Sequence, residues 1–140
     1  MRLLLCVSIM CAPAQAQSPP NGSAAGPLAE QLGRGRVVLR EIRFAPGSDR
    51  INQSSIAVLR ELAQALVASS GVFLIEGHTD ASPDAASAQL LSERRAVAVK
   101  ARLVSEGVAA GRLLAVGYGA SRPAGTDHKH NARIEVTRVQ

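Results

Sequence analysis

Residues 72–80 have the sequence VFLIEGHTD, in which a continuous apolar run is followed by a polar tail. Gly71 precedes the run as a turn signal, so the apolar segment is short and bounded. A run of this kind is typical of a strand that is covered on both faces of a sheet. We therefore expect a buried strand whose carboxyl end carries the polar side chains of Glu76-Gly77-His78-Thr79-Asp80.

Helical periodicity occurs on both sides of this strand. Before it, a helix can begin at Asn52 or Ser54 and continue toward Gly71, because apolar residues recur at helical spacing in between. After it, Pro83-Asp84 opens a second, longer helix that is expected to reach about Glu106. The strand is thus predicted to lie between two helices along the chain.

Three further segments are predicted to be strands, from their apolar runs or their alternation of apolar and polar residues: 36–44, 113–118 and 133–139. The order strand, helix, strand, helix, strand, strand predicts an α+β fold. We expect a two-layer βαβαββ sandwich, with a mixed sheet and the helices packed on one face.

The start of the chain has the composition of a leader. Arg2, a short apolar run and the small residues of Ala14-Gln15-Ala16 are features of a secretory signal, so residues 1–16 are expected to be a signal peptide. Residues 17–35 are rich in Pro, Gly, Ser and Ala and are expected to be a flexible linker. The folded domain is then expected to span residues 36–140.

Composition narrows the classes of function. Both cysteines, Cys6 and Cys11, lie in the expected signal peptide, so disulfides, thiolate metal sites and cysteine nucleophiles are not expected in the mature domain. Aromatic residues make up only 2% of the chain, and Trp is absent, which leaves few stacking platforms for nucleic acid. The net charge of +5 suits an anionic partner such as a cell-wall polymer but selects none.

Two charged residues have a structural and a functional interpretation. Arg95 shares one face of the second helix with Leu91, Val99 and Leu103, where it can extend to the edge of the core or serve a site. Asp80 lies just before the same helix, where an aspartate commonly caps a helix or forms a turn. The pattern alone favours the structural role for Asp80 and leaves Arg95 undecided.

Four motifs follow one another along the chain: Gly77-His78-Thr79-Asp80, Leu91-Ser92-Glu93-Arg94-Arg95-Ala96, Gly117-Tyr118-Gly119-Ala120-Ser121-Arg122-Pro123 and Asn131-Ala132-Arg133-Ile134-Glu135. In this order they resemble the OmpA-like C-terminal domain. That family includes the peptidoglycan-associated lipoproteins and the periplasmic part of flagellar stator proteins. The resemblance covers residues 37–139, nearly the whole expected domain.

The resemblance implies non-catalytic binding of the diaminopimelate-containing peptide stem of peptidoglycan. In the family, the Asp of the first motif meets the ligand's ammonium and the Arg of the second meets its carboxylate, and these roles carry over to Asp80 and Arg95. Thr79, Asn131 and Arg133 lie in matching motifs and are expected at the same site. The chemistry suits a zwitterionic amino-acid end, because an arginine can hold a carboxylate with two parallel hydrogen bonds.

The same resemblance implies neither an enzyme nor a cofactor or metal site. It implies a periplasmic protein that is bound to the cell wall, associated with the outer membrane and able to take an outer-membrane protein as a partner. No nucleic-acid partner is expected, and the sequence does not indicate an oligomeric state.

The chain departs from the family pattern at three positions. Ala88 replaces a usual Asn, Pro83 a usual Gly and Ala132 a usual Arg. Losing one good contact to a charged group costs about 1.5–3 kcal/mol, so two losses would move a micromolar site toward the millimolar range. An alternative is therefore an OmpA-like fold kept as a structural or interaction domain with weakened or lost peptidoglycan binding.

A third hypothesis is an enzyme or metal protein. Glu76, His78 and Asp80 alternate, so on an extended strand they would share one face and could bind Zn or Mn. His78, Asp80 and Ser82 also suggest a hydrolase. The glycines of a nucleophile elbow are missing, which makes this class the least favoured.

Overall fold

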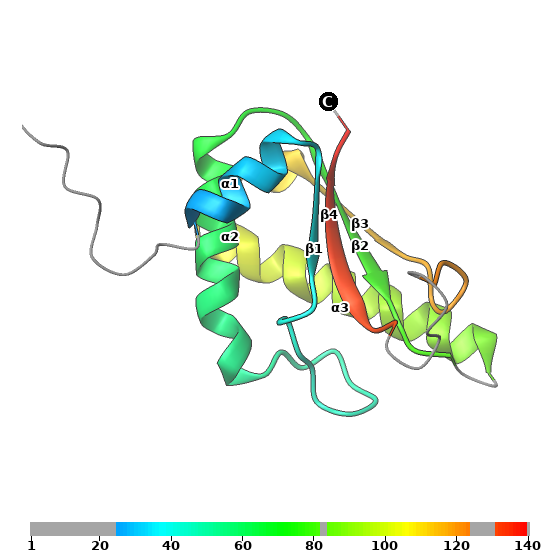
Figure 1. The fold of residues 1–140 in the computed structure, drawn as a ribbon. Coiled ribbons are helices and arrows are strands. Elements are labelled where there is room, and N and C mark those ends of the chain that lie inside the picture. The colour runs from blue at the N-terminus through cyan, green and yellow to red at the C-terminus, as the bar shows by residue number, and fades with distance from the viewer. Residues whose placement is uncertain (1–24, 82–83, 124–130, 140) are drawn as a thin grey trace, which may run out of the picture.

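The computed structural model describes residues 25–81, 84–123 and 131–139, which form a four-stranded sheet packed against helices (Figure 1). The expected signal peptide over residues 1–16 lies outside the described residues, as do Ser82 and Pro83. The described part forms a two-layer α+β fold, so the predicted fold class is confirmed.

The sheet has the strand order β1-β4-β2-β3, in which the last strand of the chain lies between the first two. Strand β4 runs antiparallel to both of its neighbours, and β2 runs parallel to β3, so the sheet is mixed as predicted. The strands are β1 (Arg36–Leu39), β2 (Phe73–His78), β3 (Leu113–Gly117) and β4 (Arg133–Arg138).

Two helices, α2 (Ile56–Ala68) and α3 (Ala85–Ser105), pack on each other, and α3 lies against β2 and β3. The short 3₁₀ helices η1 (Gln53–Ser55) and η2 (Ala110–Arg112) lead into α2 and β3. Asp84 caps α3, because its side chain accepts hydrogen bonds from the N–H groups of Ala86 and Ser87. Among the described helices, none combines the length and the apolar character that a bilayer span requires.

The first strand is shorter than predicted. Residues 36–44 were expected to be one strand, but β1 ends at Leu39, and Phe44 forms only an isolated bridge with Ile51. The physical reason is the partner strand: Leu39 pairs with Ile134, next to the first residue of β4, so the chain beyond Leu39 has little strand left to pair with.

The expected linker contains a helix, so this prediction was wrong for residues 25–33. Helix α1 (Ala25–Gly33) packs on α2 and contacts β1. Leu28 and Leu32 lie four residues apart on one face of α1, and both are buried in the main core. The proline and glycine content suggested a linker, but Pro27 lies in the first turn of α1. The N–H groups of a first turn make no hydrogen bond within the helix, so a proline is tolerated there.

Helix α3 approaches the sheet very closely at two glycines. A Cβ on Gly77 of β2 would lie 2.2 Å from the Ser92 carbonyl oxygen, and one on Gly117 of β3 would lie 2.3 Å from the Glu93 nitrogen. Only glycine fits at these positions. The contact fixes the height of α3 above the sheet and thereby the position of Arg95, one turn further along the helix.

Candidate functional site

The end of β2 meets the start of β4, because His78 lies opposite Arg133 in the antiparallel register. Two hydrogen bonds tie the residues beyond these strand ends. Asn131 Nδ2 donates to the Thr79 carbonyl oxygen (2.9 Å), and the Ala132 N–H donates to Asp80 Oδ1 (2.8 Å). Asp80 is therefore held by the residue just before β4 rather than serving as the helix cap, and it is exposed to solvent.

Arg95 reaches this site from α3 and is held by two contacts with the loop after β1. Its Nε donates to the Ser48 carbonyl oxygen (2.9 Å), and its guanidinium lies over the Phe44 ring, 4.9 Å from the centroid. Burial lowers the pKa of Arg95, and the charges of Asp80 and Asp49 oppose that shift, so the side chain remains a cation. No described residue accepts a hydrogen bond from its two terminal nitrogens, which leaves the fork for a ligand.

Asp80 and Arg95 line the same cleft, which has a volume of about 550 Å³. Phe44, Pro46 and Ile134 contribute apolar walls, and the cleft is large enough for a small-molecule ligand. The structure thus brings together the carboxylate and the guanidinium that the sequence suggested as a pair. A cleft with these two groups can receive a zwitterion, with its ammonium at Asp80 and its carboxylate at Arg95.

A smaller hollow of about 240 Å³ adjoins the same two residues and is also lined by Thr79 and Ala88. The Thr79 hydroxyl is buried and has no hydrogen-bond partner among the described residues. Ala88 offers only a methyl group where the family pattern has an amide. Besides Asp80 and Arg95, this hollow therefore has a hydroxyl with unused hydrogen-bonding capacity, in Thr79, and one position without a polar side chain, at Ala88.

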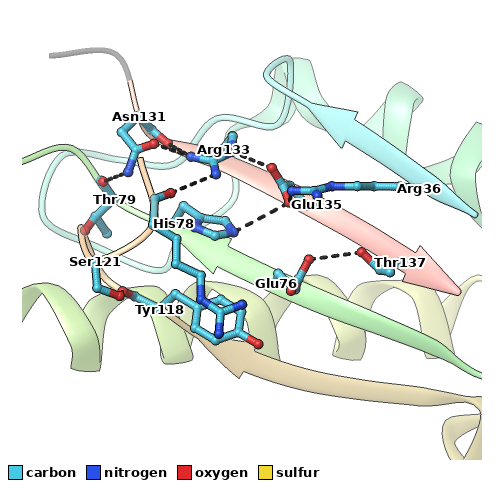
Figure 2. A network of polar contacts seen from close by, with 11 residues as sticks. Arg36, Glu76, His78, Thr79, Tyr118, Ser121, Asn131, Arg133, Glu135 and Thr137 are labelled. Carbon is cyan, nitrogen blue, oxygen red and sulfur yellow. Dashed lines mark hydrogen bonds and ion pairs between the residues drawn. The ribbon is translucent and has the colours of Figure 1, made fainter. Parts of the chain in front are cut away.

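Arg133 and Asn131 are buried and bonded within the protein (Figure 2). Arg133 Nε donates to Glu135 Oε1 (2.6 Å), Nη2 donates to the Arg122 carbonyl oxygen (3.0 Å), and Nη1 donates to Asn131. Arg133 also borders the larger cleft, but its guanidinium is committed to these partners. These two residues hold the strand ends in place, which leaves Asp80 and Arg95 as the predicted residues that offer a charged group to a ligand, while the hydroxyl of Thr79 is buried.

The trio of Glu76, His78 and Asp80 is not brought together. Glu76 and His78 lie on the sheet face opposite the helices, and the third carboxylate beside them is that of Glu135 on β4 (Figure 2). Glu135 accepts hydrogen bonds from both Arg36 and Arg133. Glu76 accepts a hydrogen bond from Thr137 Oγ1 (3.0 Å), so a metal cation would have to compete with Thr137 at one carboxylate and with two guanidinium groups at the other.

His78 is neutral in this cluster. Burial, and secondly the charge of Arg133, lowers the pKa of His78 to about 4, and its Nε2 lies 3.8 Å from Glu135 Oε2. Neither ring nitrogen has a hydrogen bond to a described residue, and the ring stacks on Tyr118 with centroids 5.5 Å apart. His78 therefore acts as a packed aromatic ring.

Sequence reasoning missed the residues that position the site. Ser92 is fully buried, and its Oγ accepts a hydrogen bond from the Gly119 N–H (2.8 Å), which ties α3 to the loop after β3. Ser48 and Phe44 hold Arg95 from a third segment. The spacing of apolar residues does not indicate contacts between such distant segments. The one available signal was that Ser92, Phe44 and Ser48 lie within the part of the chain that resembles the family.

Comparison with known proteins gives a consistent result. A family model described as the OmpA family matches residues 43–137. Outer membrane porin F of Pseudomonas aeruginosa is 38% identical over 102 residues, which are 71% of this chain and 29% of that protein. The peptidoglycan-associated lipoprotein of the same organism is 33% identical over 97 residues, 69% of this chain and 58% of that protein. The chain thus matches only part of the length of these relatives.

Solved structures share the fold. The peptidoglycan-associated lipoprotein from Burkholderia pseudomallei superposes with a TM-score of 0.59 at 27% identity, covering 76% of this chain and 91% of that one. The periplasmic domain of Helicobacter pylori MotB gives a TM-score of 0.63 at 20% identity, covering 75% of each chain. The second likeness concerns the fold alone.

Proposed function

The chain belongs to the OmpA family, and on this basis we propose that it binds the diaminopimelate-containing peptide stem of peptidoglycan without catalysing a reaction. The observation that carries the proposal is the placement of Asp80 and Arg95 on one cleft. The free end of a diaminopimelate side chain is a zwitterion, so it needs one anion and one cation on the protein a few ångströms apart.

The contacts of Arg95 support its assigned role. The Arg95 Nε donates to the Ser48 carbonyl oxygen, and the guanidinium stacks on the Phe44 ring. These two contacts order the side chain before a ligand binds. Preorganisation lowers the entropy that binding would otherwise cost. The two terminal nitrogens are then available for a bidentate contact with a carboxylate, which a lysine cannot make.

The names of similar proteins support peptidoglycan as the binding partner. Proteins named peptidoglycan-associated lipoprotein occur among both the similar sequences and the similar structures. We propose for this chain a place in the periplasm, bound to the cell wall and linked to the outer membrane through a partner protein. The domain would then connect the cell envelope to the wall.

The test is co-sedimentation with purified peptidoglycan sacculi. We expect Asp80→Ala and Arg95→Ala each to weaken binding by about 1.5–3 kcal/mol, roughly 10- to 100-fold in Kd, because each leaves one charge of the ligand unpaired. Arg94→Ala is the matched control, since Arg94 is an exposed arginine on the same helix outside the cleft. Unchanged far-UV circular dichroism excludes unfolding, and normal sedimentation of both site variants would contradict the assignment.

Ala88 favours one alternative, a fold that has kept its architecture and lost its ligand. The residue lines the smaller hollow beside Asp80 and Arg95 without a polar group. Titration with a diaminopimelate-containing peptide, followed by NMR, separates the two functions. Shifts confined to residues around Asp80 and Arg95 support binding, and their absence at millimolar peptide supports the alternative.

A further inference from the structure

The larger cleft carries more positive charge than a zwitterion needs. The charged residues of its lining are one acid, Asp80, and four arginines, Arg40, Arg43, Arg95 and Arg133. Arg133 is neutralised by Glu135, and Arg95 interacts with the charge of Asp80. A bound amino-acid end would therefore use Asp80 and Arg95 and leave the charge of Arg43 unused in the same lining.

Arg43 is fixed in place by its backbone. Its N–H donates to Ser55 Oγ (2.7 Å), and its carbonyl oxygen accepts from the Asn52 N–H (2.9 Å). The ring of the next residue, Phe44, makes a cation–π contact with the Arg95 guanidinium. Arg43 is exposed, and among the described residues no carboxylate lies within ion-pair distance of it. Arg43 thus adds an exposed cationic side chain to the residues that line the cleft, on a backbone held at its N–H and its carbonyl oxygen.

The size of the cleft leaves room for more than one ligand group. The ammonium, carbon and carboxylate of an amino-acid end are five heavy atoms, which occupy about 150 Å³ if each takes the volume share of a water. The cleft measures about 550 Å³. The cleft therefore has room for a further acidic group, which the positive charge of Arg43 in the same lining would attract.

We propose that Arg43 forms a second subsite for another carboxylate of the same peptide ligand. This inference rests on the proposed function and adds the ligand class to it: peptides that carry a free carboxylate in addition to their zwitterionic end. A guanidinium matches a carboxylate in shape and charge, and a pair at the exposed rim contributes up to about a fivefold gain in affinity.

The experiment compares two synthetic stem peptides by isothermal titration calorimetry. Both contain diaminopimelate, and they differ only in one carboxylate outside it, which is free in one peptide and amidated in the other. We expect the wild-type protein to bind the free acid about two- to fivefold more tightly and to lose much of this preference in 0.5 M salt, because exposed pairs are screened.

Arg43→Gln is expected to bind both peptides with the affinity that the wild type has for the amide. Arg94→Gln removes the same charge from an exposed site outside the cleft and is expected to keep the preference. Equal binding of the two peptides by the wild type, or a preference that survives in Arg43→Gln, overturns the second subsite while the Asp80 and Arg95 site stands. If the wild type binds neither peptide, both proposals fall.

Discussion

At the scale of single residues, His78 shows how environment sets chemistry. Its sequence neighbours suggested a ligand or a catalytic base, but the side chain is buried against Tyr118 and bordered by Arg133, Glu135 and Arg36 (Figure 2). These surroundings hold its pKa at about 4, well below the ordinary value of 6.5. The residue therefore stays neutral under conditions where a solvated histidine gains a proton.

The first prediction concerns stability against pH. Below pH 6.5 the unfolded chain binds a proton at His78 that the folded protein does not, so the free energy of unfolding falls between pH 6.5 and about 4. The difference between the two pKa values corresponds to up to about 3 kcal/mol in the free energy of unfolding, which the protein keeps above pH 6.5 and loses as the pH falls toward 4. Urea denaturation at pH 7.5 and 4.5 measures the loss.

The control for this prediction is His78→Phe, which keeps an aromatic ring and loses no hydrogen bond. We expect its stability to depend less on pH over the same interval. Equal pH dependence in the two proteins would assign the effect to the carboxylates instead.

At the scale of elements, the contact between α3 and the sheet is the feature that sets the site. Gly77 and Gly117 let the helix approach, and the bond from the Gly119 N–H to Ser92 Oγ fastens it at that height. Arg95 lies three residues after Ser92, so its reach to Ser48 depends on this approach. Ser92 thus has a packing role beside the binding role that we propose for Arg95.

A methyl group at Gly77 is expected to force α3 away from β2. Gly77→Ala should destabilise the protein by about 3 kcal/mol, because the obstacle is a backbone carbonyl that cannot rotate aside, and it should also weaken sacculus binding. Gly111→Ala serves as the comparison, since nothing lies within 4 Å of a Cβ there, and a change within about 0.5 kcal/mol is expected. Chemical denaturation of both variants distinguishes a local clash from a general effect of alanine.

At the scale of the whole molecule, the described domain extends beyond the residues that the family model matches. The family match begins at residue 43, yet α1 and β1 both precede it and contribute to the core. Leu32 is only 1% exposed and belongs to the same cluster as the residues of α2 and β1. Helix α1 is therefore part of the fold rather than a tether.

Leu32→Ala should lower the free energy of unfolding by about 2–4 kcal/mol, because it opens a cavity in the main core. Gln31→Ala, on the exposed side of the same helix, should change it by less than about 0.5 kcal/mol. Thermal or urea unfolding measures both, and a negligible effect of Leu32→Ala would mean that α1 does not contribute to stability.

The sequence by itself determined the elements and their type. Apolar runs and helical spacing located β2, α2, α3, β3 and β4, because these patterns arise within one element and need no knowledge of its neighbours. The same locality explains the error at α1: Leu28 and Leu32 are a weak pattern among small residues, and the helix gains its stability from α2 and β1.

The tertiary structure alone decided which side chains meet. Asp80 and Arg95 share a cleft because β4 inserts between β1 and β2 and fixes the strand ends, whereas Glu135 rather than Asp80 joins Glu76 and His78 through the register of β2 and β4. The tertiary structure likewise places Arg133 and Asn131 where they form hydrogen bonds within the protein, with Glu135 and Thr79. Contacts between residues far apart in the chain depend on strand order and register, which short-range periodicity does not encode.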